Sequence, residues 1–133
     1  MYRFEFHEDP GYLEAELAGF WSLDELKGFD RAINHYVAKY AARFPQFPML
    51  SDSRDFAVQS AEVSEAFAAC SSAGAERHSG RVAIVVKSAL SRMQTARFTD
   101  KNWTRRFFDD MDEARAWVVE DARARADARR RHG

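Results

Sequence analysis

Apolar and polar residues alternate over two short stretches near the start of the chain, residues 2–6 and 13–17. Alternation with a period of two is the pattern of a strand that is buried on one face. The intervening Asp9-Pro10-Gly11 suits a tight turn, because proline fixes its own φ and glycine accepts a positive φ. The pattern therefore predicts an antiparallel hairpin.

A helical period follows the hairpin. Ser22-Leu23-Asp24-Glu25 is a capping box, in which the serine hydroxyl and the glutamate carboxylate satisfy backbone N–H groups at the start of a helix. Pro45 is expected to end this helix, because the residue before a proline avoids the α conformation. The apolar face between these limits has the helical period. It consists of Leu26, Phe29, Ile33, Tyr36, Val37, Tyr40 and Phe44.

The middle of the chain indicates the fold class. Residues 48–52 predict a short strand, and residues 60–73 predict an amphipathic helix that closes near Gly74. Residues 82–86 are five consecutive apolar residues, Val-Ala-Ile-Val-Val, and indicate a strand buried on both faces. Both faces of a strand are usually covered only in a parallel sheet with helical crossovers. The chain is therefore predicted to be an α/β domain.

A shorter helix and a last strand follow this apolar run. Ser88 or Ser91 is placed to cap a helix that reaches about Phe98. Residues 104–108 then predict a strand. Together the segments predict a mixed five-stranded sheet, with an antiparallel hairpin followed by parallel strands, and about four helices.

The final helix begins at a second capping box, residues 110–113, and is predicted to bury Trp117. Beyond Ala122 its inner face has no apolar residue other than alanine. We therefore expect residues 123–133 to be a frayed, arginine-rich end.

The composition sets outer limits on this picture. A length of 133 residues, of which 46% are hydrophobic and 31% charged, fits a single domain over residues 1–133 that needs no disulfide or metal. The chain has one cysteine and no stretch that resembles a signal peptide or a transmembrane segment, so we expect a cytoplasmic protein. A net charge of −1 gives no reason to expect nucleic acid binding. The arginine-rich end leaves an RNA- or membrane-surface role open.

Several of these segments occur together in one known group of proteins. They are the hairpin, the capped helix, Leu50-Ser-Asp-Ser-Arg54, the strand at residues 81–86 and the strand, acidic turn and Ala-x-x-Trp helix at residues 107–118, which is the most specific. Over nearly its whole length the chain resembles the bacterial SpoIIAA-like branch of the STAS superfamily, sometimes grouped with SEC14-like domains. The resemblance implies a βα superhelix with a mixed sheet. It also implies binding, because STAS relatives bind partner proteins or nucleotides and SEC14-like relatives bind lipids.

One departure from that family concerns regulation. Anti-sigma-factor antagonists of the superfamily carry an Asp-Ser-Ser-Gly-type motif at the start of the helix that follows the strand at residues 50–52, and a partner kinase phosphorylates its serine. Residues 59–63 of this chain are Gln-Ser-Ala-Glu-Val, so the phosphorylated position falls on Ala61 or Glu62. A kinase-controlled switch is therefore not expected. Ser60 is interpreted either as a partner contact or as a helix cap.

Six polar residues are candidates for a ligand site. Two parallel strands should end beside them, at the carboxyl edge of the sheet where ligands of open α/β sheets bind. Cationic side chains and the free N–H groups of a helix start favour a phosphate or a carboxylate. The candidates form two groups, one after each strand. In the alternative interpretation Asp52 and Arg54 of the first group pair with neighbours, and Lys87 of the second group points to water. The candidates are Asp52, Ser53, Arg54, Lys87, Ser88 and Arg92.

The chain offers little chemistry for catalysis. Its four histidines lack metal-ligand spacing and no Gly-x-Ser-x-Gly elbow is present, so we expect no enzyme, no metal and no cofactor. Cys70 lies on an apolar stripe with Val63 and Phe67 and is interpreted as a buried thiol. Trp103 stands among cations in a polar loop, where it would either contact a partner or fold back as a lid on the core.

Fold and chemistry together favour a non-enzymatic, STAS-like binding module with a regulatory role. We expect it to recognise a protein partner or a small anionic or lipid ligand at the carboxyl edge of the sheet. The alternative is a SEC14-like carrier of a lipid or hydrophobic ligand, which needs an apolar cavity that the abundant aromatic residues would either line or fill. A homodimer is compatible with both interpretations.

Overall fold

The strands follow one another across the sheet in the order in which they occur in the chain. A computed structural model describes residues 1–75, 78, 80–99 and 101–132. In it β1 pairs antiparallel with β2, and all the other neighbouring strands are parallel, which confirms the predicted mixed sheet. The strands are β1 (Tyr2–His7), β2 (Tyr12–Gly19), β3 (Met49–Phe56), β4 (Arg81–Val85) and β5 (Thr104–Phe108).

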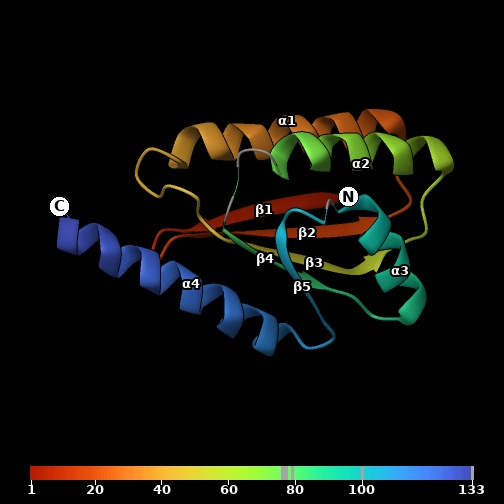
Figure 1. The fold of residues 1–133 in the computed structure, drawn as a ribbon. Helices are drawn as coiled ribbons and strands as arrows, with labels where there is room; N and C mark the ends of the chain where they lie inside the picture. Colours follow the sequence, from red (N-terminus) through yellow and green to blue (C-terminus); the bar gives the residue numbers. More distant parts are fainter. Residues whose placement is uncertain (76–77, 79, 100, 133) are drawn as a thin grey trace.

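Helices cover both faces of the sheet (Figure 1). Right-handed crossovers that always step in the same direction across a sheet place their helices on one face. Accordingly, α1 and α2 lie side by side over one face, α3 lies beside α2, and α4 follows the last strand and crosses the opposite face. The helices are α1 (Leu23–Tyr40), α2 (Ala61–Ala75), α3 (Ala89–Phe98) and α4 (Met111–His132).

The predicted helix starts are confirmed by their caps. Ser22, Ser88 and Asp110 each accept a hydrogen bond of 2.9 to 3.1 Å from the backbone N–H three residues ahead. These bonds satisfy N–H groups that have no partner within the helix. Ser88, and not Ser91, is the cap of α3.

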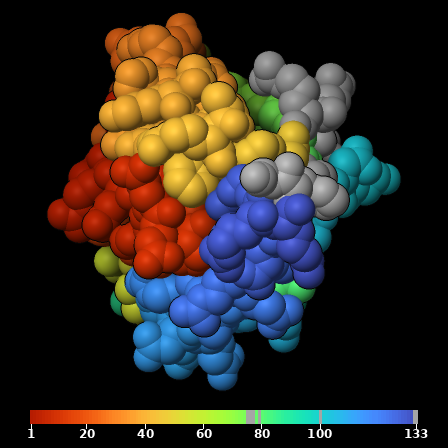
Figure 2. All heavy atoms as spheres, turned by 90° about the vertical axis from the view of Figure 1, so that its left-hand side faces the viewer, coloured from red at the N-terminus to blue at the C-terminus, as the bar shows by residue number. Residues whose placement is uncertain are grey.

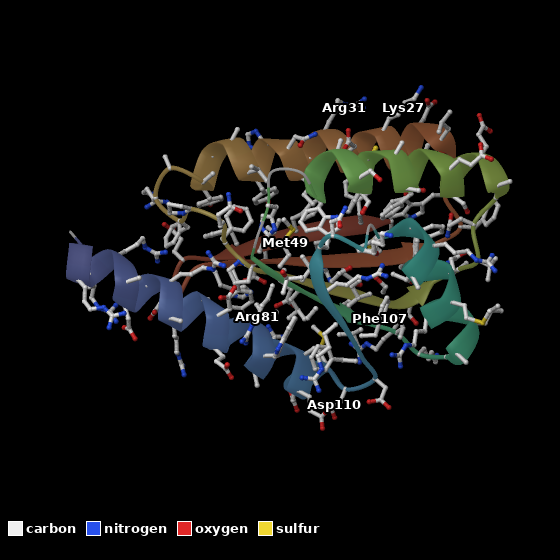
Figure 3. The ribbon with its side chains drawn as sticks, in the orientation of Figure 1. Lys27, Arg31, Met49, Arg81, Phe107 and Asp110 are labelled. Carbon is white, nitrogen blue, oxygen red and sulfur yellow. The ribbon has the colours of Figure 1, made fainter. Side chains whose placement is uncertain are left out.

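Aromatic rings fill the space between the sheet and the first two helices. Trp21 is 1% exposed and lies at the centre of this cluster, with ring centroids of its neighbours 4.8 to 6.4 Å away. Charged side chains such as Lys27 and Arg31 project outward from α1 (Figure 3). The aromatic residues thus pack against one another and form a solid core. The neighbours of Trp21 are Tyr2, Phe29, Phe56 and Phe67.

Small side chains seat α4 on the opposite face of the sheet. Ala114, Val118 and Ala122 are each at most 1% exposed and pack in one cluster with β3, β4 and β5. Trp117, expected to be buried, lies half-buried at the margin of this cluster. The guanidinium of Arg81 lies 4.9 Å from the centre of its ring. The close approach of α4 to the sheet therefore depends on small residues more than on the tryptophan.

α1 ends earlier than the sequence predicts. It stops at Tyr40, and the N–H of Phe44 turns back to the carbonyl of Tyr40 at 2.9 Å. Phe44 packs against the hairpin, with its ring centroid 5.2 Å from that of Phe6. A Cβ atom on Gly11, which has φ +117°, would lie only 2.5 Å from the Phe44 ring. The helix thus ends four residues before Phe44, and the Phe44 ring holds the segment that leads to Pro45 against the hairpin.

The end of the chain also differs from the expected fraying. α4 continues to His132, and Gly133 lies outside the described residues. Arg125 donates a 3.1 Å hydrogen bond to the aspartate four residues earlier in the helix. The guanidinium of Arg129 lies 4.9 Å from the ring of Phe44, so this end of α4 lies against the hairpin region (Figure 2). Charged side chains thus hold a helix end that has little apolar surface to bury.

Candidate functional site

Exposed apolar side chains gather at the carboxyl edge of the sheet. Five large apolar residues are exposed among those that the structure describes, and each lies near the carboxyl end of a parallel strand. Met1 and Phe20 flank the end of β2, Val58 follows β3, and Leu90 and Met93 lie on α3 after β4. Three of them, Val58, Leu90 and Met93, line one groove, and exposed apolar surface that gathers in this way is typical of an interaction site.

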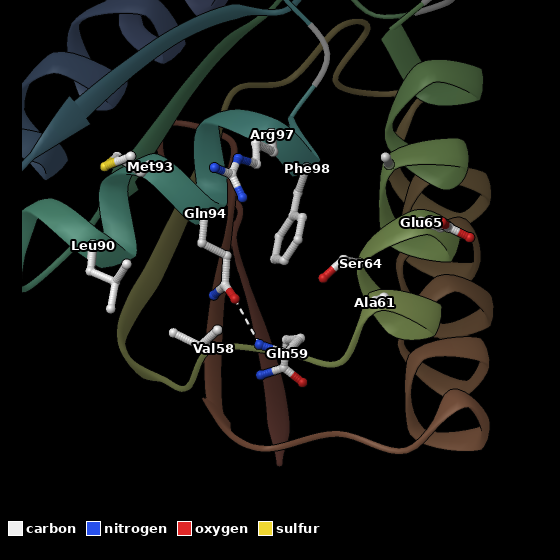
Figure 4. Close-up of a pocket in the computed structure, with 11 residues that line it drawn as sticks. Val58, Gln59, Ala61, Ser64, Glu65, Leu90, Met93, Gln94, Arg97 and Phe98 are labelled. Atoms are coloured by element: carbon white, nitrogen blue, oxygen red, sulfur yellow. Dashed lines mark hydrogen bonds between the residues drawn. The ribbon is translucent and has the colours of Figure 1, made fainter.

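A groove of about 540 Å³ opens at this edge between α2 and α3 (Figure 4). Val58, Leu90 and Met93 line it on one side, and the ring of Phe98 forms part of its wall. Grooves of this size accommodate small ligands or a few side chains of a docked peptide. We call it the α2–α3 groove. Its lining residues are Val58, Gln59, Ala61, Ser64, Glu65, Ala68, Leu90, Met93, Gln94, Arg97 and Phe98.

Two buried glutamines build the floor of the α2–α3 groove. The backbone N–H of Gln59 donates to Gln94 Oε1 at 2.7 Å, and Gln94 Nε2 donates to the Ala57 carbonyl at 2.9 Å. The Gln59 amide donates to the carbonyls of Ala57 at 2.7 Å and Gly19 at 2.9 Å, and it accepts from the backbone N–H of Trp21 at 2.8 Å. The segments that follow β2 and β3 are thereby tied to α3, which makes the floor a fixed surface.

Few polar groups lie on the rim of the α2–α3 groove. Arg97 is exposed and forms no ion pair with any residue that the structure describes. The hydroxyl of Ser64 points into the groove, whereas the carboxylate of Glu65 points away from it (Figure 4). One guanidinium beside apolar walls suits a carboxylate or phosphate that is attached to an apolar group.

The structure places the first group of predicted site residues inside β3, because this strand runs on to Phe56 and does not end at Asp52. Arg54 donates two hydrogen bonds to the Asp52 carboxylate, at 2.8 and 2.9 Å, and these bonds lower the pKa of that carboxyl. Ser53 is buried and bonds to the Ser51 hydroxyl at 3.0 Å. The pairing of acid and arginine that the sequence left open is therefore the observed arrangement.

The second group lies at the carboxyl edge, as the sequence predicts. Lys87 follows the end of β4 and is exposed, with no ion pair to any described residue. Ser88 caps α3, and the guanidinium of Arg92 lies 5.3 Å from the centre of the Phe107 ring. Asp52 is in register with Val85, so the two groups approach one another, but no hydrogen bond or ion pair between described residues joins them.

Ser60 and Trp103 both support α2. The hydroxyl of Ser60 accepts a hydrogen bond of 3.2 Å from the Val63 N–H at the start of that helix. The indole N–H of Trp103 donates to the Ser71 carbonyl at 2.9 Å and to the Ser71 hydroxyl at 3.0 Å. The half-buried Trp103 ring lies 4.9 Å from the ring of His78. Trp103 thus has the folded-back position that the sequence left as one of two alternatives.

Cys70 is half-buried, not fully buried as expected. It lines a smaller groove of about 380 Å³ between α1 and α2. Burial, and then the nearby Asp30 carboxylate, raise the pKa of its thiol. Within the part of the chain that the structure describes, no three histidine, cysteine or carboxylate side chains lie close enough to hold a metal ion, and no helix is long and apolar enough to span a membrane.

The sequence analysis did not single out the residues that form the α2–α3 groove. α3 has a partly inverted pattern, in which Gln94 and Thr95 are buried together with Phe98, and Leu90 and Met93 are exposed. Gln94 lies four residues before Phe98, so its amide is on the same, inner face of the helix as that apolar ring. This spacing was the signal in the sequence that could have revealed the groove floor. A polar residue on a buried helical face is expected to bond to backbone groups nearby.

One solved structure is similar to this chain over most of its length. It is an uncharacterized protein from the DUF3478 family with a SpoIIAA-like fold from Shewanella loihica PV-4. It is 18% identical, its TM-score is 0.67, and the match covers 89% of this chain and 92% of that chain. The chain has a SpoIIAA-like fold. This agrees with the fold that the family resemblance implied, and at such an identity the likeness concerns the fold alone. No protein-family model and no curated protein matches this SpoIIAA-like domain.

Proposed function

We propose that this SpoIIAA-like domain is a non-enzymatic, regulatory binding module that docks an apolar segment of a partner protein in the α2–α3 groove. The observation that carries the proposal is the inverted pattern of α3. Leu90 is 61% exposed and Met93 is 57% exposed, although the same helix buries a glutamine and a threonine. Burying such a side chain is worth about 1.5–3 kcal/mol. A partner that covers both side chains recovers this free energy.

The charges around α3 specify the partner further. Lys87, Arg92 and Arg97 are exposed on or beside the helix, and α3 has no acidic residue in its first turn. A docking segment with apolar anchors and flanking acidic residues would complement this surface. Rim charges mainly raise the association rate and fix orientation, whereas the buried anchors supply most of the affinity.

An anionic amphiphile is the second candidate, which corresponds to a lipid carrier of SEC14-like type. The volume of the α2–α3 groove and the position of Arg97 on its rim favour it. The solid aromatic core argues for a surface groove in preference to an enclosed lipid cavity. The two candidates share one surface, so the experiments must separate them.

Site-specific photo-crosslinking in the source cells tests the protein partner. A photoreactive phenylalanine at Leu90 or Met93 should form one discrete adduct, and the same probe at Glu113, on the exposed start of α4, should not. Val58→Asp should abolish the adduct, because it places a charge in the apolar wall. The double variant Lys87→Ala with Arg92→Ala should bind the partner protein several-fold more weakly than the unaltered domain does. Its folding stability should be nearly unchanged, since exposed charges contribute only about 0–1 kcal/mol to folding. Absence of any adduct at both α3 positions would overturn the proposal.

Titration with decanoate and with decanol tests the amphiphile. If the groove holds an anionic amphiphile, decanoate should shift the methyl NMR resonances of Leu90 and Met93 more strongly than decanol does. Arg97→Gln should remove this difference between the two probes. Native mass spectrometry of the freshly purified protein would then show a retained ligand. No methyl shift with either probe would exclude the amphiphile and leave the protein partner.

A further inference from the structure

β1 is an edge strand, and its outward backbone groups can be assigned from its pairing with β2. Met1 and Ala18 exchange two backbone hydrogen bonds, so alternate residues from Met1 onward bond to β2. The N–H and C=O groups of Tyr2, Phe4 and Phe6 therefore point away from β2, along the edge of the sheet. Such an edge is a template for another strand.

The side chains of β1 are self-complementary in one antiparallel register. Two copies of β1 related by a twofold axis through Phe4 place Phe4 opposite Phe4, Tyr2 opposite Phe6 of the second copy and Arg3 opposite Glu5 of the second copy. The outward residues then form the hydrogen-bonded pairs. Arg3 and Glu5 form the closer, non-hydrogen-bonded pairs, in which cross-strand side chains interact best.

The neighbouring registers lack this match. A shift in one direction places Glu5 opposite Glu5 of the second copy, and a shift in the other direction places Arg3 opposite Arg3. Like charges that lie directly opposite one another destabilise a strand pair. The charge pattern therefore selects a single register.

The groups that this pairing uses are accessible. The side chains of Arg3 and Glu5 are 74% and 72% exposed. In Figure 2 the residues at the N-terminal end of the chain reach beyond α1 at one flank of the molecule. Arg3 already donates to Glu16 of its own chain through Nη2, but a guanidinium has five N–H donors, so it can bind a second carboxylate.

We propose that β1 is a homodimer interface, at which two copies join their sheets through antiparallel β1 strands centred on Phe4. The partner is a second copy of this chain, since the same short strand supplies both the charge and its complement. This interface is separate from the α2–α3 groove, so it stands or falls independently of the proposed function.

A charge-exchange experiment tests the interface by sedimentation equilibrium. The unaltered protein should dimerise. Arg3→Glu alone sets two carboxylates opposite each other in every cross-strand charge pair, and Glu5→Arg alone sets two guanidinium groups opposite each other. Each variant should therefore dimerise about tenfold more weakly or worse.

An equimolar mixture of the two variants restores opposite charges in the cross-strand pairs and should form a heterodimer. Glu113→Arg, the matched control on α4, should leave the dimer unchanged.

Three results would overturn the proposal. They are a monomeric unaltered protein, a dimer that survives both single substitutions, or single variants that remain monomeric when mixed. Circular dichroism of each variant shows whether it is folded. The mixture supplies a gain of association that misfolded variants could not produce.

Discussion

Gln59 fixes the geometry of the carboxyl edge through a single side chain. Its amide bonds to three backbone groups at the ends of β2 and β3, those of Gly19, Trp21 and Ala57, and its backbone N–H bonds to the amide of Gln94. Every polar atom of the Gln59 side chain is therefore used. Because a buried amide without partners costs free energy, this network favours one arrangement of the segments that it joins.

Gln59→Ala should lower the free energy of unfolding by about 2–4 kcal/mol, because it leaves the buried backbone N–H of Trp21 without an acceptor and removes two donors. Urea denaturation measures this change. Asn34→Ala, at an exposed position of α1, is the control and should change stability by less than about 0.5 kcal/mol. An equal effect of both substitutions would show that the network does not support the edge.

Cys70 should react slowly with thiol reagents at neutral pH, because desolvation and the Asp30 carboxylate raise the pKa of its thiol and the thiolate is the reactive form. The labelling rate should therefore rise at a higher pH than it does for cysteine in a short peptide. Asp30→Asn removes the negative charge, so it should shift the profile towards lower pH. A profile that does not move would mean that burial alone controls this thiol.

Local patterns predicted the chemistry of individual residues only where that chemistry is local. The caps at Ser22 and Asp110 depend on residues three positions away, and both were predicted. The groove floor joins Gln59 to Gln94 across 35 positions, and no local pattern reports such a contact. The site residues in β3 were placed at its end because Ser53 and Arg54 are polar, whereas pairing with β2 extends the strand through them.

At the scale of whole elements, Trp103 holds the end of α2 by a close contact. A Cβ atom on Gly74 would lie 2.8 Å from the Trp103 ring. Gly74→Ala should therefore destabilise the protein by about 1–3 kcal/mol through overpacking, although alanine is the better helix former. Thermal unfolding measures the change. Adding Trp103→Phe makes room for the methyl group, so the double variant should lose less stability than the two single changes combined. If the stability losses of the two single variants simply add in the double variant, the proposed contact is contradicted.

The sequence predicted which elements exist better than where they end. The strand at residues 104–108 has the predicted limits, and the hairpin pairing agrees with the alternation. α1 ends at Tyr40, and Phe44 just beyond it contacts the hairpin, whereas α4 continues to His132 and its Arg125 and Arg129 have partners. The contacts of Phe44 with Phe6 and of Arg129 with Phe44 join elements that are far apart in the chain, so no local pattern predicts them.

At the scale of the whole molecule, the end of α4 connects the last helix to the hairpin region. A chain that stops after Ala122 loses the Arg125–Asp121 pair and the contact between Arg129 and Phe44. Such contacts contribute about 0.3–1 kcal/mol each, so the truncated protein should be about 1 kcal/mol less stable. Guanidinium denaturation measures the difference, and Arg129→Ala isolates one contact. An unchanged midpoint would instead support the frayed end that the sequence suggested.

The order of the strands in the sheet has a consequence for how the protein is made. Each strand pairs with the strand translated just before it, so the sheet can grow one strand at a time as the ribosome releases the chain. α4 is translated after all five strands, yet it covers Leu50, Val85 and Phe108 on one face of that sheet. This apolar face therefore stays open to water and to chaperones until the final helix has emerged.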